Sequence, residues 1–278
     1  MKKLTIPDII KRKGGEKLTV LTAYDASFAR LLDAAGIDIL LVGDSLGNVL
    51  LGYESTVPVT MEEMLHHARA VRRGSSAAFV VADMPFLSYQ ISVEDAVRNA
   101  GRFYKEAGSD AVKLEGGTEV CPAVRAIVRA GMAVMGHIGL TPQTAANLGG
   151  YKTQGKDADS ARRLLADARD LAEAGVFAIV MECIPDRLAK VITESVAVPT
   201  IGIGAGPDCD GQVLVTHDLL GMFEKFVPRF VKGYANLAPQ IRQAVAGFKQ
   251  EVQAGSFPDA AHSFTMQLDV DSLINDRE

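Results

Sequence analysis

Short apolar runs alternate with helix-type segments along almost the whole chain. Eight of these runs have the length and composition of buried strands, the last being weaker than the others: residues 18–23, 37–43, 77–82, 111–115, 132–137, 177–182, 199–204 and 211–216. Strands in a parallel sheet are covered by helices on both sides and therefore read as continuous apolar runs. The pattern predicts a parallel sheet buried between helices.

Amphipathic segments fill the spaces between these runs, and several of them end on glycine, which accepts the left-handed conformation of a helix C-terminus. They cover residues 27–36, 61–74, 93–108, 159–175 and 185–196. About eight strand–helix repeats in a chain of 278 residues favour a closed (β/α)₈ barrel over an open, doubly wound sheet. The open sheet remains the alternative, because one weak strand decides the count.

The whole chain is predicted to form one domain. No linker rich in Pro, Gly and Ser interrupts residues 1–278. A short helix is expected at the N-terminus, and residues 241–255 are expected to form a helical extension outside the basic repeat.

Four of the apolar runs deliver a carboxylate to their C-terminal end. These carboxylates belong to Asp44, Asp83, Glu115 and Glu182. In a (β/α)₈ barrel the C-terminal ends of the strands lie at one rim, where the loops build the active site. Any one of the four could instead cap a helix. Together they predict an acidic active-site rim.

Strand periodicity indicates which side chains enter this rim. In "AVKLE" (111–115), Lys113 and Glu115 share one face, which should point into the barrel, while the aliphatic pair between them points outward. The same alternation brings Glu182 to the interior and turns the neighbouring Cys183 away from it to pack. His137, in "VMGHIGL", ends another strand and joins the same rim.

A divalent cation is the simplest partner for such a set of carboxylates. Closely packed carboxylates repel one another and raise each other's pKa, and a bound cation relieves that repulsion. Hard oxygen ligands without a His/Cys cluster at metal-binding spacing favour Mg²⁺ or Mn²⁺ over zinc.

Composition excludes several classes of partner. A net charge of −5 provides no electrostatic footprint for nucleic acid or an anionic membrane. No apolar run is long enough to span a bilayer, and the N-terminus lacks the apolar core of a secretory signal. Three cysteines, without metal-ligand spacing, are typical of a reducing compartment. We therefore expect a cytoplasmic protein.

Longer segments of the chain closely resemble the ketopantoate hydroxymethyltransferase family. They extend from about residue 4 to 265 and include "LLVGDSLGNVLLGYESTVPVTMEEMLHHARAV", "VVADMPFLSY", "AVKLEGG", "VMGHIGLTPQ", "MECIP" and "IGIGAGPDCDGQVLVTHDLLG". The closing "QLDVDSLINDRE" (267–278) matches none of the family's segments, and we interpret it as a variable tail.

The resemblance implies a barrel of the phosphoenolpyruvate/pyruvate superfamily type, assembled into a homodecamer. It implies transfer of a hydroxymethyl group from 5,10-methylenetetrahydrofolate to 3-methyl-2-oxobutanoate through a Mg²⁺-stabilised enolate, a step of pantothenate biosynthesis. The family's metal ligands, for one Mg²⁺ per subunit, fall on Asp44, Asp83 and Glu115, and its general base falls on Glu182. Its substrate contacts fall on Asp44, Ser45, Asp83 and Lys113, and we expect His137 to lie near the substrate.

Two other functions are compatible with parts of this pattern. A Mg²⁺-dependent lyase or mutase of the same superfamily, acting on a C–C or P–C bond, would use a similar rim. Such relatives carry a catalytic cysteine in a gating loop, and no "KxC" stretch follows "AVKLEGG" here. A non-catalytic oligomeric scaffold would not be expected to keep the complete set of base, lysine and three metal carboxylates.

Overall fold

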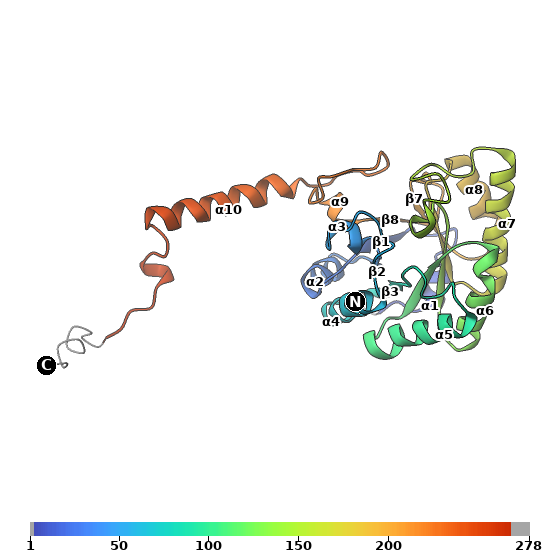
Figure 1. Cartoon of the computed structure of the whole chain (residues 1–278), viewed down its shortest axis with the longest axis horizontal. Coiled ribbons are helices and arrows are strands. Elements are labelled where there is room, and N and C mark those ends of the chain that lie inside the picture. The colour runs from blue at the N-terminus through green and yellow to red at the C-terminus, as the bar shows by residue number, and fades with distance from the viewer. Residues whose placement is uncertain (1–2, 268–278) are drawn as a thin grey trace.

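A computed structural model describes residues 3–267, in which eight parallel strands close into a barrel in sequence order (Figure 1). The strands are β1 (Leu18–Thr22), β2 (Ile39–Val42), β3 (Phe79–Asp83), β4 (Ala111–Glu115), β5 (Val134–Gly139), β6 (Ala178–Glu182), β7 (Thr200–Ile203) and β8 (Gly211–Leu214). β8 pairs with both β7 and β1, so the weakest of the predicted strands is the one that closes the barrel. The barrel prediction is confirmed and the open sheet is excluded.

Helices surround the barrel on its outside. The α-helices are α1 (Ile6–Ile10), α2 (Ala26–Ala34), α3 (Leu46–Val49), α4 (Met61–Gly74), α5 (Val93–Arg102), α6 (Cys121–Arg129), α7 (Ala158–Ala174), α8 (Asp186–Ser195), α9 (Thr216–Leu219) and α10 (Leu237–Ala254). Single turns of other helix types are η1 (Phe103–Ala107), η2 (Thr118–Val120), η3 (Pro142–Thr144) and η4 (Ala260–His262).

Two differences from the sequence prediction concern helices. α6 was not among the helices predicted, although it begins at Cys121 with Pro122 in its first turn, a favoured position for proline. The predicted helix 93–108 is α-helical only to Arg102 and continues as a π-turn that ends at Gly108. Helix type depends on the packing of these residues, which periodicity alone does not specify.

The alternation along the strands produces two separate hydrophobic layers. Side chains of the inner layer fill the barrel, and Ile9 of α1 belongs to this layer at its N-terminal end. The outer layer lies between the strands and the helices and includes Val112 and Leu114 of β4. Ala111 lies in the inner layer, so the inward face of β4 is the one that carries Lys113 and Glu115, as the alternation predicted.

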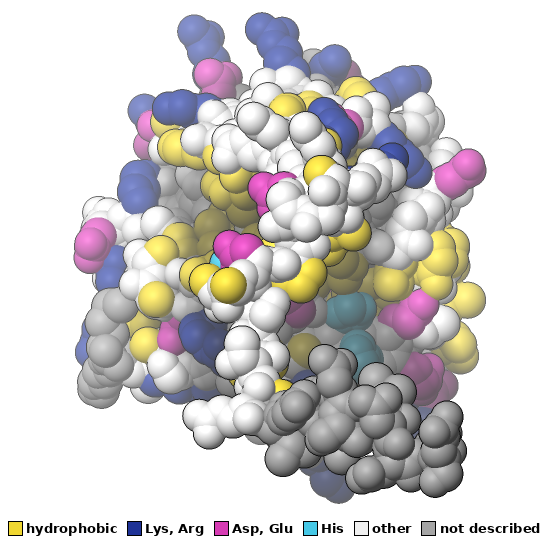
Figure 2. All heavy atoms as spheres, turned by 90° about the vertical axis from the view of Figure 1, so that its left-hand side faces the viewer, with side chains coloured by type: hydrophobic (Ala, Val, Ile, Leu, Met, Phe, Trp, Pro, Cys, Tyr) yellow, Lys and Arg dark blue, Asp and Glu magenta, His cyan; other side chains and the backbone are white. Residues whose placement is uncertain are grey.

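The C-terminal part of the described chain leaves the barrel. α10 extends away from it (Figure 1), and the tail predicted at 267–278 lies outside the described residues from position 268 onward. On the face shown in Figure 2, hydrophobic side chains gather near the middle of the molecule, and acidic and basic side chains are interspersed around them. Within residues 3–267, no helix is both long and apolar enough to cross a membrane.

Candidate active site

One cavity of about 710 Å³ opens at the C-terminal ends of the strands. Its lining includes all seven residues singled out from the sequence: Asp44, Ser45, Asp83, Lys113, Glu115, His137 and Glu182. Five of these come from the ends of β3, β4, β5 and β6, and the other two follow β2. The barrel therefore brings reactive side chains from well-separated parts of the chain into one cavity.

Two aspartates and a lysine form the base of the cavity. Lys113 Nζ lies 2.8 Å from Asp83 Oδ1, with both side chains 4% exposed. The backbone N–H of Asp44 donates to Asp83 Oδ2 at 3.1 Å. Burial raises the pKa of Asp83, and the charge of Lys113 partly offsets this. Burial, together with the charges of Asp83 and Glu115, raises the pKa of Asp44 well above its usual value.

Gln143, in η3, connects two of the carboxylates. Its side-chain amide donates to Asp44 Oδ2 at 2.9 Å, and its backbone N–H donates to Glu115 Oε2 at 3.0 Å. The Tyr89 hydroxyl donates to Gln143 Oε1 at 2.7 Å, which orients the amide. Gln143 thereby holds Asp44 and Glu115 in a shared buried network.

His137 lies between the two glutamates. Its Nδ1 is 3.5 Å from Glu115 Oε1 and its Nε2 is 3.2 Å from Glu182 Oε2. Burial and the charge of Lys113 oppose protonation, but the two glutamates outweigh them and raise the pKa of His137 to about 9. Nδ1 is also 3.2 Å from Lys113 Nζ, a contact that only an unprotonated Nδ1 can accept. Nδ1 therefore accepts from Lys113 when the imidazole is neutral and faces Glu115 as a donor when it is protonated.

Glu182 sits at the end of β6, where the backbone is held by its neighbour β5. The N–H of Leu140 donates to the carbonyl of Glu182 at 2.8 Å. Gly139 has a φ of +94°, and a Cβ at this position would lie 2.2 Å from the same carbonyl oxygen. Glycine is therefore required for the close approach that fixes the Glu182 backbone. The Glu182 side chain is 15% exposed and reaches the cavity.

The long segment after β2 covers one side of the cavity. Ser45 accepts or donates a hydrogen bond with the Tyr24 hydroxyl at 2.9 Å. Further along, Asn48, Val49 and Tyr53 also line the cavity. This segment therefore forms part of the cavity wall.

The prediction for Cys183 was wrong. Cys183 lines the same cavity rather than packing away from it. Its φ is +49°, so the strand alternation stops at Glu182 and does not apply to the next residue. Burial and the charge of Glu182 raise the pKa of the Cys183 thiol to about 12, which disfavours a thiolate nucleophile.

The donor set suits a divalent cation. In residues 3–267, no group of three or more His, Cys, Asp or Glu side chains is already arranged around a metal position. The three carboxylates of Asp44, Asp83 and Glu115 are nevertheless each 5% exposed or less. Burial raises the pKa of Asp83, and burial with the charges of Asp83 and Glu115 raises that of Asp44. Burial would also raise the pKa of Glu115, but His137 and Lys113 lower it. Three buried carboxylates with hard oxygen donors fit Mg²⁺.

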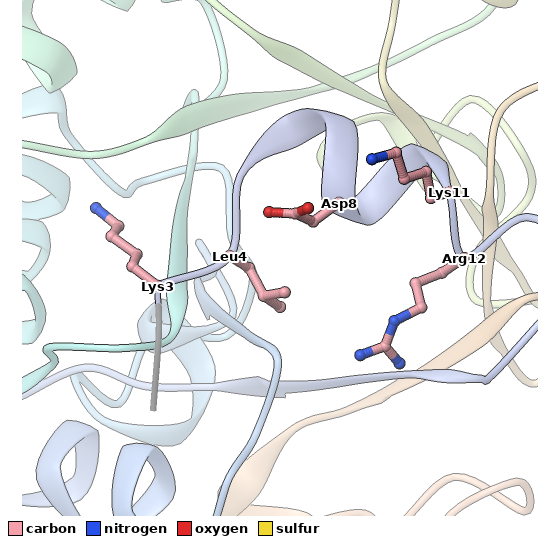
Figure 3. Close-up of a pocket in the computed structure, with 5 residues that line it drawn as sticks. All are labelled: Lys3, Leu4, Asp8, Lys11 and Arg12. Atoms are coloured by element: carbon pink, nitrogen blue, oxygen red, sulfur yellow. The ribbon is translucent and has the colours of Figure 1, made fainter.

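A smaller cavity of about 360 Å³ lies beside α1, away from the strand ends that carry the acidic residues (Figure 3). It is lined by Lys3, Leu4, Asp8, Lys11 and Arg12. Lys3 pairs with Asp110 at 2.5 Å and Arg12 pairs with Glu16 at 2.7 Å. Lys3 and Arg12 thus serve contacts within the protein, and none of the five residues lines the larger cavity.

Sequence reasoning did not identify Gln143, Tyr89 or Asp218 as parts of the site. Gln143 ends the segment "VMGHIGLTPQ", so the signal for it was present among the segments that resemble the family. Tyr89 ends "VVADMPFLSY" and Asp218 lies within "IGIGAGPDCDGQVLVTHDLLG", so both also belong to segments that resemble the family. Unlike the predicted residues, they follow their strands by several positions. Their contribution depends on loop conformation, which the sequence pattern does not specify.

Comparison with known proteins places the chain in a family. A model of the ketopantoate hydroxymethyltransferase family matches residues 3–260. The chain is 63% identical over 272 residues to the 3-methyl-2-oxobutanoate hydroxymethyltransferase of Desulfotalea psychrophila, covering 98% of each chain. It is 60% identical to the enzyme of that name from Moorella thermoacetica, covering 94% of this chain and 98% of the relative.

Solved structures with the same fold are more distant. 2,3-Dimethylmalate lyase, a member of the PEP mutase/isocitrate lyase superfamily, aligns with a TM-score of 0.57 at 16% identity, covering 98% of this chain and 97% of the lyase. This likeness supports the barrel type that was expected. The family match and the two relatives carry the assignment: the chain belongs to the ketopantoate hydroxymethyltransferase family.

Proposed function

We propose that the protein transfers a hydroxymethyl group from 5,10-methylenetetrahydrofolate to 3-methyl-2-oxobutanoate, giving 2-dehydropantoate, a step of pantothenate biosynthesis. The observation that carries this proposal is the convergence of base, lysine and carboxylates on one cavity in a chain 63% identical to an enzyme of that name. A lyase or mutase activity has support only from structures that share the fold at low identity, and fold alone does not imply function.

Deprotonation of the oxo acid is assigned to Glu182. Its carboxylate, on a rigid strand end, takes the proton from C3, and His137 at 3.2 Å orients it. Negative charge then develops on the keto oxygen. The Lys113 ammonium, which is buried, and the Ser45 hydroxyl hold the substrate carboxylate and this oxygen. The N10–methylene bond of the folate opens to an iminium ion at N5, water adds to it, and the N5–C bond then breaks to release tetrahydrofolate and a formaldehyde-level carbon. The enolate carbon attacks this carbon, and the oxygen of the water becomes the hydroxymethyl oxygen, which takes up the proton held by Glu182.

Asp44, Asp83 and Glu115 are the residues we propose for one Mg²⁺ per subunit. Bound there, Mg²⁺ would act as a Lewis acid that favours negative charge on the keto oxygen of the substrate. The burial of all three carboxylates, and the mutual repulsion that contributes to the raised pKa of Asp44, support this assignment.

We further propose that residues 1–278 form one folding domain and that the protein works in the cytoplasm as a homo-oligomer, a decamer by its resemblance to the family. α10 supports the assembly, because its exposed apolar side chains Ile241, Val245, Phe248 and Val252 lie at helical spacing and form one stripe. The three cysteines are free, as expected for a reducing compartment.

The first test is exchange of the C3 proton of 3-methyl-2-oxobutanoate in D₂O, followed by NMR without folate. We expect the wild type to exchange with Mg²⁺ and not with EDTA. Glu182→Gln should lower the rate about 10²- to 10⁴-fold, the contribution of a positioned general base. Glu194→Gln, on the exposed side of α8, is the matched control.

Exchange that is independent of Glu182 would overturn the assignment of the base. If the wild type neither exchanges nor turns over when methylenetetrahydrofolate is added, the substrate assignment itself is wrong.

A further inference from the structure

The cavity is larger than the oxo acid needs. At about 710 Å³ it falls within the range of about 300–1,000 Å³ that holds drug-sized ligands. The groups assigned to the oxo acid and the metal come from β2 to β6. A separate part of the lining follows β8 and has had no role so far: Val215, Asp218, Phe223, Lys225, Phe226, Pro228, Arg229 and Phe230.

Asp218 is the carboxylate in this part of the cavity. It belongs to the short helix α9, directly after β8, and its Oδ1 is shielded from solvent. Within residues 3–267 this oxygen has no hydrogen-bond partner. Burial raises the pKa of Asp218 to about 6. A shielded acceptor without a partner is costly, so its presence in a cavity wall points to a ligand that donates hydrogen bonds to it.

Aromatic side chains lie close to this carboxylate in the chain and line the same cavity. They are carried by a loop whose two ends are held at α9. Met222 N–H donates to the His217 carbonyl at 2.8 Å where the loop begins, and Tyr234 N–H donates to the Leu219 carbonyl at 2.8 Å near its end. Phe230 packs directly on Gly204, where a Cβ would lie 2.7 Å from its ring. The loop therefore presents a positioned apolar wall.

We propose that Asp218 and the aromatic wall of Phe223, Phe226 and Phe230 bind the pterin ring of the folate co-substrate. The reduced pterin carries an N–H and an adjacent amino group on one edge, a pair of donors that matches the two oxygens of a carboxylate. Its flat ring needs an apolar or aromatic surface to lie against. This inference rests on the proposed function, and it names the site of the second substrate.

The charges at the rim agree with the rest of that molecule. Lys225 and Arg229 line the cavity on the same loop, and both side chains are exposed. In the described part of the chain, neither forms an ion pair with an acidic residue. The glutamyl end of a folate carries carboxylates, which these two cations attract when the pterin occupies the wall.

The nearly isosteric variant Asp218→Asn tests whether Asp218 contributes to binding of the folate and not to binding of the oxo acid. We expect the KM for methylenetetrahydrofolate to rise about 10- to 100-fold, the loss expected for a hydrogen bond to a charged group. The KM for the oxo acid and the folate-independent C3 exchange rate should remain within about twofold. Tetrahydrofolate binding by titration calorimetry should weaken by the same factor as the KM.

Glu224→Gln is the matched control, because Glu224 is exposed on the same loop, pairs with Arg242 at 2.6 Å and does not line the cavity. A tetrahydrofolate analogue with hydrogen in place of the amino group tests the contact directly. Wild type should prefer the natural ligand, and Asp218→Asn should lose that preference.

An unchanged affinity for tetrahydrofolate in Asp218→Asn would overturn the proposal. A parallel loss of C3 exchange would overturn it too, because Asp218 would then serve the enolising site. Failure of the proposed function is a different result, in which the wild type itself shows neither exchange nor turnover.

Discussion

At the scale of single residues, Lys113 supplies a positive charge to a group of buried carboxylates. It lies 2.8 Å from Asp83, while Asp44 depends on a neutral amide from Gln143. Buried charges are stable only when they are paired, so removing one partner is far more costly than the net value of the pair. The stability of this site should therefore respond to any cation that binds there.

Replacing Lys113 with methionine should lower the melting temperature and abolish turnover. Breaking a buried ion pair costs about 3–5 kcal/mol. If Asp44, Asp83 and Glu115 hold Mg²⁺, the ion should restore part of this loss, and thermal melts in Mg²⁺ and in EDTA measure the difference. Lys190→Met, at an exposed position of α8, is the control. If the melting temperature of Lys113→Met is the same in Mg²⁺ and in EDTA, this would argue against a metal at these carboxylates.

Asp210 has a structural role at the start of β8. It accepts from the N–H groups of Gly14 and Thr200, each at 2.8 Å, and pairs with Lys13 at 2.9 Å. Burial alone would raise its pKa, but these contacts hold the pKa of Asp210 below its ordinary value of 3.8. The folded state therefore binds its proton less tightly than the unfolded chain does.

Asp210→Asn should lower the free energy of unfolding at pH 7 by about 1–3 kcal/mol. Because the folded pKa is depressed, the carboxylate stabilises the protein above pH 3.8 and loses that effect as the pH falls through the folded value. The difference between wild type and variant should thus shrink below about pH 4 in urea titrations. Asp208→Asn, at an exposed neighbouring position, should change little.

Two glycines show how the same residue has different roles at the scale of elements. Gly74 ends α4 where that helix meets α2, and a Cβ there would lie 2.3 Å from the carbonyl oxygen of Ala26. Gly101 lies within α5, and a Cβ there would meet nothing within 4 Å. Gly74 therefore permits close packing of two helices, whereas Gly101 only weakens its own helix.

The same substitution at these glycines should have opposite effects. Gly101→Ala should stabilise the protein by about 0.5–1 kcal/mol through helix propensity. Gly74→Ala should destabilise it by about 1–3 kcal/mol or more through overpacking against backbone. Chemical denaturation of the two variants under one condition provides the comparison, and equal shifts would contradict the packing at Gly74.

Elements also explain which helices could be predicted. α4 begins with a capping box between Thr60 and Glu63, both visible in the sequence, and its predicted bounds of 61–74 are those observed. α6 lacks a side-chain cap, and it was missed. α8 also lacks a side-chain cap but was predicted at 185–196 from its amphipathic pattern, so a cap helped to fix the bounds of a helix and was not the only signal.

At the scale of the whole molecule, α10 has an apolar stripe and little to cover it. Ala238 is its only buried residue, and the helix extends away from the barrel (Figure 1). Val245 is 61% exposed and Phe248 is 58% exposed. An amphipathic helix of this kind gains stability from packing its apolar face, which a second copy of the chain could supply.

Val245→Asp should therefore weaken the assembly. We expect the wild type to sediment as an oligomer and the variant to shift to smaller species, since a charge on the stripe cannot be buried without a partner. Gln243→Asp places the same charge on another face of α10 and should leave the sedimentation unchanged. Identical sedimentation of all three proteins would exclude this stripe from the interface.

The sequence by itself determined the strand–helix order and the acidic rim, because each depends on local periodicity and on the rule that parallel strand ends gather at one edge. It favoured a barrel over an open sheet, but the pairing of β8 with β7 and β1 decided closure. Glu115 and Glu182 were placed inside the barrel by alternation alone. Tertiary structure decided what lies beyond the strands. Cys183 turned toward the cavity once its φ became positive, and Gln143 and Asp218 entered the site through loops whose conformation depends on packing against distant residues.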